Sequence, residues 1–494
     1  MVVILKMLPF DDKSELQVVI DMPESTPIEE TLIVLTEMGR YLEGVEEVTN
    51  WQAYAGTSAP INFNGLVRQY YLRRAPWQGD LQVNLIDENR DRQSHDIALS
   101  LRAPLTEIGE RFGASVKIVE VPPGPPVLSP VVAEVYGPDA ATRQALANEL
   151  AQMMRGIEGL VDVDTSLTAP SERWHLQVDR HRAAQLGVRQ AQVVSALNMA
   201  LGEQQVSYLH DPTAKHAIPI RLILSEGDQA QQAALLSIPL LSDQGSVVLL
   251  GEVADIVASD WPGAIYHKDL LPVTYVTADM AGKVDSPLYG MFAAASALSD
   301  QDQAPEQYYI RQPDWPEASA LKWDGEWQIT YETFRDMGIA YAVGVFVIFL
   351  LLVAQFRAYV MPLIVMAPIP LTLVGIMPGH AILGKEFTAT SMIGMIALAG
   401  IIVRNSILLV VFIRQLIDEG KSLEDAVVLA GAVRIKPIAL TAVSAMVGAL
   451  FILTDPIFSG LAISLIFGLA VSTVLTVLAI PLLYYSLAKN YGIR

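Results

Sequence analysis

Five long apolar runs in the last third of the chain constrain its fold more than any other feature of the sequence. Each run holds at most one Asp, Glu, Lys, Arg or His, and each approaches or exceeds the roughly 20 helical residues needed to cross a bilayer core. The core of a soluble protein would not supply five such runs in succession. The sequence therefore predicts five membrane-spanning helices, over residues 337–356, 358–384, 387–413, 437–453 and 457–488.

Charge is divided unevenly along the 494 residues, which carry 53 Asp and Glu against 33 Lys and Arg, a net charge of −20. From Met337 onward there are nine basic and six acidic residues, which leaves 24 basic and 47 acidic residues in the preceding head. So acidic a head argues against a nucleic-acid partner. The chain contains no cysteine, which excludes disulfides, thiolate catalysis and Cys-ligated zinc.

Basic residues in the loops between the apolar runs predict the orientation in the membrane. The loops on one side carry seven Lys and Arg residues, whereas those on the other side carry only Lys385. The positive-inside rule then places the C-terminus in the cytoplasm and the acidic head outside. Residues 415–433 have the pattern of an amphipathic helix on the inner surface. Residues 1–6 are too short and too weakly basic for a signal peptide, and we interpret them as the remnant of a membrane helix.

Short strand-like runs alternate with helical patterns in the head. Residues 1–127 follow the order β-α-β-β-α-β. A second unit of this kind comprises residues 128–171 and 263–335, with its last strand expected at Gln307–Arg311, because residues 172–262 interrupt it as an inserted domain. The predicted fold is therefore an α+β head of two ferredoxin-like units with an inserted domain, followed by an all-α bundle of five transmembrane helices over residues 336–488.

Three stretches carry a resemblance to a known family. Lys6–Arg74 resembles the periplasmic porter domain of resistance–nodulation–division (RND) efflux transporters of the multidrug, acriflavine-resistance type. Gly394–Phe412 (GMIALAGIIVRNSILLVVF) and Arg434–Thr441 (RIKPIALT) are similar to two of the membrane helices of that family. The resemblance covers essentially the whole chain, but complete members have twelve spans and two heads. It therefore implies the C-terminal half of a transporter that needs a separate N-terminal half.

The resemblance also implies an activity and partners. RND transporters are proton-driven antiporters of the bacterial inner membrane, with a large periplasmic domain, that export drugs or other amphiphilic compounds. They form trimers that work with a periplasmic adaptor protein and an outer-membrane channel. The inserted domain, residues 172–262, would match their docking domain. The energy source would be the proton gradient, and no cofactor is expected.

Arg404 is the sharpest candidate for a functional residue. A charge in the middle of a membrane span costs about 2.5–3.5 kcal/mol on insertion scales, so Arg404 is expected to face a partner. The resemblance implies a proton relay in which a basic residue, usually Lys, pairs with aspartates of another helix. The corresponding residues here are Arg404, Asn405 and Thr441. The alternative for Arg404 is a side chain that extends to the cytoplasmic surface. The alternative for Thr441 is a hydroxyl that satisfies its own helix backbone.

No carboxylate lies within a predicted span, because all six acidic residues after Met337 fall in the expected loops. These residues are Glu386, Asp418, Glu419, Glu424, Asp425 and Asp455. A proton relay needs such a group, so this chain alone is not expected to run the antiport cycle.

Four aromatic residues are candidates for substrate binding. By resemblance, Tyr54, Phe63, Tyr70 and Tyr71 lie where the family places its aromatic pocket and a flexible loop, and aromatic faces suit varied apolar ligands. The alternative is that they belong to the ordinary core of the head. The methionines show no paired pattern, which disfavours a metal-exporter's relay.

No sequence motif indicates an enzyme. The chain has no Gly-rich phosphate-binding loop, no nucleophile–base pair and no His cluster with metal-ligand spacing. Two hypotheses remain, a transporter half or a truncated, non-transporting permease fragment that serves as a scaffold for adaptor proteins.

Overall fold

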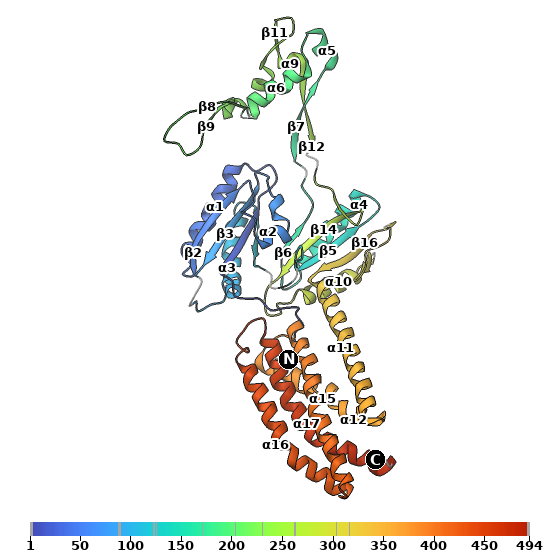
Figure 1. Cartoon of the computed structure of the whole chain (residues 1–494). Coiled ribbons are helices and arrows are strands. Elements are labelled where there is room, and N and C mark those ends of the chain that lie inside the picture. Colours follow the sequence, from blue (N-terminus) through green and yellow to red (C-terminus); the bar gives the residue numbers. More distant parts are fainter. Residues whose placement is uncertain are drawn as a thin grey trace. The chain divides into compact units, whose positions relative to one another are not determined.

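The computed structural model of the chain is shown in Figure 1. It describes residues 3–86, 90–121, 124, 126–169, 171–202, 204–229, 231–260, 263–302, 304–315 and 317–491. Two compact units divide the chain. One comprises Met1–Leu167 with Ile265–Arg494, and the other, which we call the inserted unit, comprises Thr168–Ala264.

The first ferredoxin-like unit has four antiparallel strands in the order β2-β3-β1-β4, with two helices packed on the sheet. Its elements are β1 (Glu15–Asp21), α1 (Ile28–Leu42), β2 (Val48–Ala55), α2 (Phe63–Val67), η1 (Tyr70–Leu72), β3 (Gln78–Leu85), α3 (Ser94–Glu110) and β4 (Ser115–Val119). Alternate residues of β1, namely Leu16, Val18 and Ile20, enter a core shared with α1 and α3. This core is complete within the unit.

The second ferredoxin-like unit repeats this topology around the inserted unit. Its elements are β5 (Val131–Tyr136), α4 (Ala140–Arg155), β6 (Leu160–Thr165), β13 (Tyr266–Lys268), β14 (Leu271–Met280), α10 (Pro287–Ser299), β15 (Glu306–Tyr308) and β16 (Ala320–Gly325). The sheet order is β13-β14-β5-β16-β15, and β6 pairs with β14. A core of its own lies between the sheet and the helices α4 and α10.

One strand of the second unit differs from the prediction. The last strand was expected at Gln307–Arg311, but β16 takes that place beside β5, with Leu321 opposite Val135. Residues of β15 form only a three-residue parallel edge strand. The charges of Lys322 and Asp324 interrupt the apolar pattern of β16, although Leu321 and Trp323 on its other face are fully buried.

The inserted unit contains a long antiparallel ribbon of β7 (Glu172–Val178) and β12 (Ala254–Asp260), visible in Figure 1. Between these strands lie α5 (Arg180–Gln185), α6 (Gln190–Leu201), β8 (Gln204–Leu209), β9 (Ile218–Leu222), α7 (Glu226–Gln229), α8 (Gln232–Leu236), β10 (Pro239–Leu241), β11 (Val247–Leu249) and α9 (Leu250–Val253). A small core includes Val188, Val193, Leu240 and Leu250. The unit bounds enclose the predicted insertion at residues 172–262.

Within the part of the chain that the structure describes, five helical segments are long and apolar enough to cross a membrane, which confirms the predicted class of fold. They are α11 (Glu326–Phe356), the broken segment α12 (Val360–Met366), α13 (Pro368–Leu371) and α14 (Leu373–Leu383), then α15 (Ala389–Asp418), α16 (Leu423–Leu450) and α17 (Ser459–Tyr491). Prolines explain the breaks in the second segment, because proline lacks an amide hydrogen and clashes with the preceding turn. Figure 1 shows α15, α16 and α17 side by side.

The fourth helix begins well before the predicted position 437. The chain turns at Gly420, and the hydroxyl of Ser422 then accepts a hydrogen bond from the amide of Asp425 at 3.1 Å. This cap starts α16 at Leu423. The amphipathic pattern over residues 415–433 is therefore not a separate surface helix, as predicted, but the end of α15, a turn and the start of α16.

Small residues let the bundle helices approach closely. A Cβ added to Gly375 of α14 would lie 2.5 Å from the backbone oxygen of Phe467 in α17. A Cβ on Gly394 of α15 would lie 2.7 Å from the Cβ of Ser464. Such contacts are typical of helices that pack in a membrane.

The N-terminal segment, Val3–Phe10, has no helix, and Leu5 forms a parallel bridge with Phe387. The first two residues of the helix remnant expected at residues 1–6 lie outside the described residues. The backbone of the segment joins the start of α15. The amide of Phe387 donates to the carbonyl of Ile4 at 2.8 Å, and the amide of Ala389 donates to the carbonyl of Met7 at 3.0 Å. The chain before β1 is thus attached to the membrane bundle.

Candidate functional site

Arg404 lies in the middle of α15 and on an exposed face of that helix. Gly400, Leu408 and Val411 share the face, at helical spacing, and a Cβ on Gly400 would have no described atom within 4 Å apart from the adjacent turns of α15 itself. Arg404 forms no hydrogen bond or ion pair with any residue that the structure describes. At 1.5 Å per residue, it is about 13 Å along the helix from Ile413, where the uncharged run ends. A cation without a partner therefore stands deep in a predicted membrane span.

The other two predicted relay residues lie in different surroundings. Asn405 is buried in the bundle, with 5% of its surface exposed, whereas Arg404 beside it faces outward. Thr441 is exposed on α16, and its hydroxyl donates to the carbonyl of Pro437 at 2.8 Å. Over the described residues, no hydrogen bond or ion pair joins these three side chains to one another. For Thr441, the geometry is that of a hydroxyl bonded to its own helix.

The acidic residues after Met337 lie at helix ends or between helices. Asp418 is the last residue of α15, and Glu424 and Asp425 are in the first turn of α16, so these three are not in loops as predicted. The Glu424 carboxylate accepts a hydrogen bond from the hydroxyl of Tyr485 at 2.6 Å. Because these acidic groups cluster around the α15–α16 turn, none of them approaches the level of Arg404.

The four predicted substrate-binding aromatics lie outside the core of the first unit. Tyr54 is on β2, Phe63 opens α2, and Tyr70 and Tyr71 form the following turn, η1. None belongs to the buried core cluster of that unit, and Phe63 and Tyr71 are 43% and 40% exposed. Their neighbours Ile61, Leu66 and Leu72 are also exposed. The connection between β2 and β3 therefore presents an apolar, aromatic surface.

A network of charges that sequence reasoning missed joins the two ferredoxin-like units. The ammonium of Lys117 on β4 lies 2.9 Å from Asp21 of its own unit and also contacts Asp164 on β6 of the other unit. Arg73 completes the group through Asp21, at 2.8 Å. Burial alone would raise the pKa of Asp21, but the adjacent Lys117 and Arg73 cations lower it below its usual range. Burial alone would lower the pKa of Lys117, but Asp21 and Asp164 raise it.

A second charged cluster ties the N-terminal segment to both units. The buried Lys6 ammonium lies 2.6 Å from Asp285, the residue before the Ser286 cap of α10. The His95 ring on α3 lies 2.8 Å from Glu120 and 3.4 Å from the same Asp285, and it stacks on Phe10. Burial would lower the pKa of His95, but the hydrogen bond that Glu120 accepts from the ring and the charges of Glu120 and Asp285 raise the pKa above its ordinary value.

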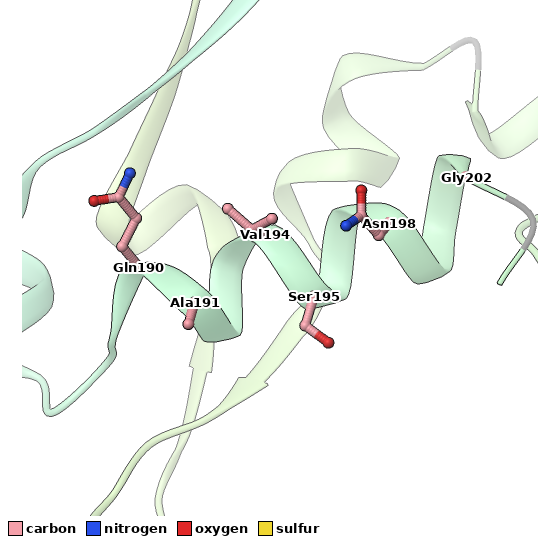
Figure 2. A pocket seen from close by; sticks show the side chains of 6 residues that line it. All are labelled: Gln190, Ala191, Val194, Ser195, Asn198 and Gly202. Atoms are coloured by element: carbon pink, nitrogen blue, oxygen red, sulfur yellow. The ribbon is translucent and has the colours of Figure 1, made fainter.

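Two hollows are lined by uncharged or mixed side chains. One, of about 490 Å³, is lined by aromatic and apolar residues of α10 and the first turns of α11, including Phe292, Trp327 and Tyr331. The other, of about 760 Å³, lies on the inserted unit along α6. Figure 2 shows Gln190, Val194 and Asn198 along one side of that helix.

A family model and curated relatives both match this chain. The model of the AcrB/AcrD/AcrF family matches residues 3–488. The chain is 26% identical over 363 residues to the swarming motility protein SwrC of Bacillus subtilis. It is 26% identical over 368 residues to the cobalt-zinc-cadmium resistance protein CzcA of Cupriavidus metallidurans. Each alignment covers 72% of this chain and 33% of the relative.

A solved structure shares the fold over nearly the whole chain. The crystal structure of a heavy metal efflux pump matches with a TM-score of 0.79 and 19% identity, over 99% of this chain and 48% of the pump. The chain thus spans about a third of the curated relatives and about half of the solved pump. Five candidate membrane spans beside a large extramembrane α+β region are the arrangement of inner-membrane pumps of this class. The chain belongs to the AcrB/AcrD/AcrF family of RND transporters, which are not enzymes.

Proposed function

We propose that this chain is the C-terminal half of a proton-driven RND exporter and that it works with an N-terminal half. The single observation that carries the proposal is Arg404, a cation in the middle of an apolar helix with no partner among the described residues. An intramembrane charge is stable when a carboxylate of another helix faces it. The acidic residues after Met337 lie at the ends of helices or between them, so we infer that the carboxylate comes from the other half.

Arg404 serves as a fixed counter-ion in this scheme. A guanidinium remains protonated and binds a carboxylate through two nitrogens, so the titrating group is the partner's carboxylate. When that carboxylate takes up a proton, its attraction for Arg404 falls and α15 is free to shift. Asn405 and Thr441 are proposed as polar members of the same relay. The support for Thr441 is weaker, because its hydroxyl is already bonded to Pro437.

The N-terminal segment offers a route from this relay to the head. It is hydrogen-bonded to residues 387–389 at the start of α15, and Lys6 within it pairs with Asp285 of the second ferredoxin-like unit. A displacement of α15 along its axis would therefore pull on a segment that contacts both units through Asp285 and His95. Movement of this kind is how proton uptake in the membrane would change the head.

The proposed substrates are drugs or other amphiphilic compounds, and the exposed aromatic surface of Tyr54, Phe63, Tyr70 and Tyr71 supports them. Aromatic faces bind varied apolar groups without a fixed hydrogen-bond geometry. Metal ions are the competing class of substrate, favoured by the similarity to the cobalt-zinc-cadmium resistance protein CzcA and to the heavy metal efflux pump. We further propose a trimer that binds an adaptor protein and an outer-membrane channel through the inserted unit, whose α6 hollow is open to a partner.

Export by cells that contain the complete transporter tests the proposal. Ethidium and Co²⁺ would be used as separate probes, with Arg404→Glu, Arg404→Lys and, as a matched control, Lys385→Glu in an exposed loop. Arg404→Glu should reduce export to the background of cells without the transporter, because it places a carboxylate opposite a carboxylate. Arg404→Lys should retain part of the activity, and Lys385→Glu nearly all of it.

The outcomes also separate the two hypotheses. Export of ethidium but not Co²⁺ supports an amphiphile exporter, and the reverse supports a metal exporter. Undiminished export by Arg404→Glu would refute the relay. If the unaltered protein exports neither probe but still binds an adaptor, the chain is a non-transporting scaffold and the proposal fails.

A further inference from the structure

His380 is a titratable side chain inside the membrane bundle that the proposed relay does not use. Within the five predicted spans, His380 and Arg404 are the only residues of the types Asp, Glu, Lys, Arg and His. His380 lies on α14, one turn before the helix ends at Leu383, and it has no exposed surface. An imidazole gains or loses a proton near neutral pH. Ionisable side chains inside membrane spans mark ion and proton pathways, so His380 is a candidate for one.

Both ring nitrogens of His380 lack a hydrogen-bond partner among the described residues. The backbone of Lys385 and Glu386 approaches the ring without meeting hydrogen-bond geometry. The ring of Phe387 contacts the imidazole edge to face, with the two centroids 5.6 Å apart. A neutral imidazole has one donor and one acceptor, and a buried polar group without a partner is unfavourable. An apolar side chain would avoid this cost, so packing does not explain the histidine.

Contacts of small residues give the level of His380 in the bundle. A Cβ on Gly468 of α17 would lie 2.3 Å from the side chain of Leu398 on α15 and 3.0 Å from that of Ile376 on α14, so these positions share a reference level. Helix α14 runs toward the head and α15 away from it. At 1.5 Å per residue, His380 is about 6 Å on the head side of the reference level, and Arg404 is about 9 Å on the other side. A proton entering from the head side therefore reaches His380 about 15 Å before the level of Arg404.

Two serine hydroxyls in the bundle, those of Ser464 and Ser406, are also buried without a hydrogen-bond partner among the described residues. The Cβ of Ser464 on α17 lies 2.7 Å from the place of a Cβ on Gly394 of α15. Gly394 is about 6 Å on the head side of the reference level, so Ser464 is level with His380. Ser406 follows Arg404 by two residues on α15. Water satisfies buried polar groups of this kind, with about three hydrogen bonds for each molecule. Both levels therefore offer partners for bound water.

Few charged groups lie near the imidazole. Burial opposes a charge on the ring, and the carboxylate of Glu386 in the turn after α14 favours one. Lys385 beside it is exposed, and Lys6, whose amide bonds to the same turn, is paired with a carboxylate of the head. Helices α12 and α13 contain no charged residue, α17 contains only Lys489 in its last turn, and the first charge on α15 is Arg404. The protonation of His380 is thus governed by Glu386 and by water that reaches the ring.

Phe387 connects this site to the head. Its ring contacts His380, and its amide donates to the carbonyl of Ile4 at 2.8 Å. Its carbonyl accepts a hydrogen bond from the amide of Lys6 at 3.2 Å. A charge gained by His380 would therefore appear beside the residue that holds the N-terminal segment.

We propose that His380 is a proton-binding residue of the transport cycle, which takes up a proton from water on the head side and passes it through bound water toward the carboxylate that faces Arg404. The neutral imidazole binds the proton at its unprotonated nitrogen and becomes an imidazolium. Loss of that proton to the next water restores the neutral ring. The inference rests on the proposed proton-driven export, and it adds a titratable group of this chain to the relay.

Proton flux into liposomes that contain the complete transporter tests the proposal. A pH-sensitive dye inside the liposomes would report the flux that follows addition of ethidium or Co²⁺. His380→Gln keeps a donor and an acceptor but cannot take up a proton, so the substrate-dependent flux should fall roughly ten-fold or more. The same change at the exposed His175 is the control and should leave the flux unchanged. A flux of His380→Gln equal to that of the unaltered protein would overturn the proposal.

Deuterium exchange at the imidazole C2 position provides a test that needs no substitution and therefore does not depend on the folding of a variant. Mass spectrometry of the complete, unaltered transporter would follow His380 and the exposed His175 in the same sample. Exchange requires water at the ring, and its rate rises with pH and levels off once the ring has lost its proton. We expect such a curve for His380. No exchange at His380 while His175 exchanges would show a dry ring and overturn the proposal.

The two experiments also separate this proposal from the export function on which it rests. If the unaltered protein shows no substrate-dependent proton flux, the proposed export fails. The exchange curve of His380 then still decides whether the residue binds a proton.

Discussion

Three cations of the head and the Arg404 cation of the membrane bundle differ in their partners. In the head, Arg73, Arg102 and Lys117 each face a carboxylate of this same chain. In the bundle, Arg404 faces none that the structure describes. The cost of an unpaired charge is larger in a membrane than at a protein surface, so the difference is informative. The difference supports the proposal that a helix of another chain segment, with a carboxylate, packs on the outward face of α15.

The largest expected effect concerns the self-contained head. Trp323 is fully buried in the second ferredoxin-like unit, and its indole donates to Gln307 at 2.8 Å. Trp323→Ala should lower the free energy of unfolding by about 3–5 kcal/mol. Trp315→Ala removes the same side chain from a site that is 72% exposed and should change stability little. Urea unfolding followed by fluorescence measures both, and similar losses would contradict the assigned core.

Substitutions at two glycines of the bundle, Gly375 and Gly400, compare the effect of a larger side chain on a buried and on an outward helix face. Gly375→Leu forces α14 and α17 apart, because even a Cβ would lie 2.5 Å from the backbone of Phe467. Overpacking of this kind costs about 1–3 kcal/mol or more. The Cβ of Gly400→Leu would meet no described atom of another helix within 4 Å, so this variant should not lower the melting temperature in detergent.

The same glycine pair also tests the outward face. Gly400 shares the face of Arg404, so Gly400→Leu should impair export if a partner helix packs there, although the isolated chain stays stable. Normal export by this variant, together with normal stability, would mean that the face meets only lipid.

The smallest effect is a pH dependence within the head. Because its carboxylate neighbours raise the pKa of His95, protonation of His95 stabilises the folded state. That contribution is complete below the ordinary value of 6.5 and is lost as the pH rises through the higher folded pKa. The stability difference between the unaltered protein and His95→Gln should therefore shrink with rising pH. The exposed His175→Gln is the control, and a difference that grows with pH would refute the assignment.

Much of the fold follows from periodicity in the sequence. Strands Val48–Ala55, Val131–Tyr136 and Leu160–Thr165 lie where alternation of apolar residues predicts them. The boundaries of α11 and α16 differ from the prediction, because polar residues extend both helices beyond their apolar runs. Strand β16 was missed for a related reason, since only one of its faces is apolar.

The candidate site was predictable only in part. Arg404 stands out in the sequence because one charge interrupts an apolar run. The charged pairs between the two units cannot be recognised in the sequence. Lys117 and Asp164 are 47 residues apart, and Arg102 and Asp162 are 60 residues apart. Only the approach of two sheet edges brings them together. The alternation of Asp162 and Asp164 along a strand was the available signal, since charges on strand edges oppose pairing.

A cross-link from position 404 tests the central claim most directly. A photoreactive benzoylphenylalanine would replace Arg404 in cells that contain the complete transporter, and the products would be identified by mass spectrometry after irradiation. The account predicts a cross-link to a membrane helix that carries acidic residues within its apolar span. Products formed with lipid alone, or with a helix that has no acidic residue, would contradict it.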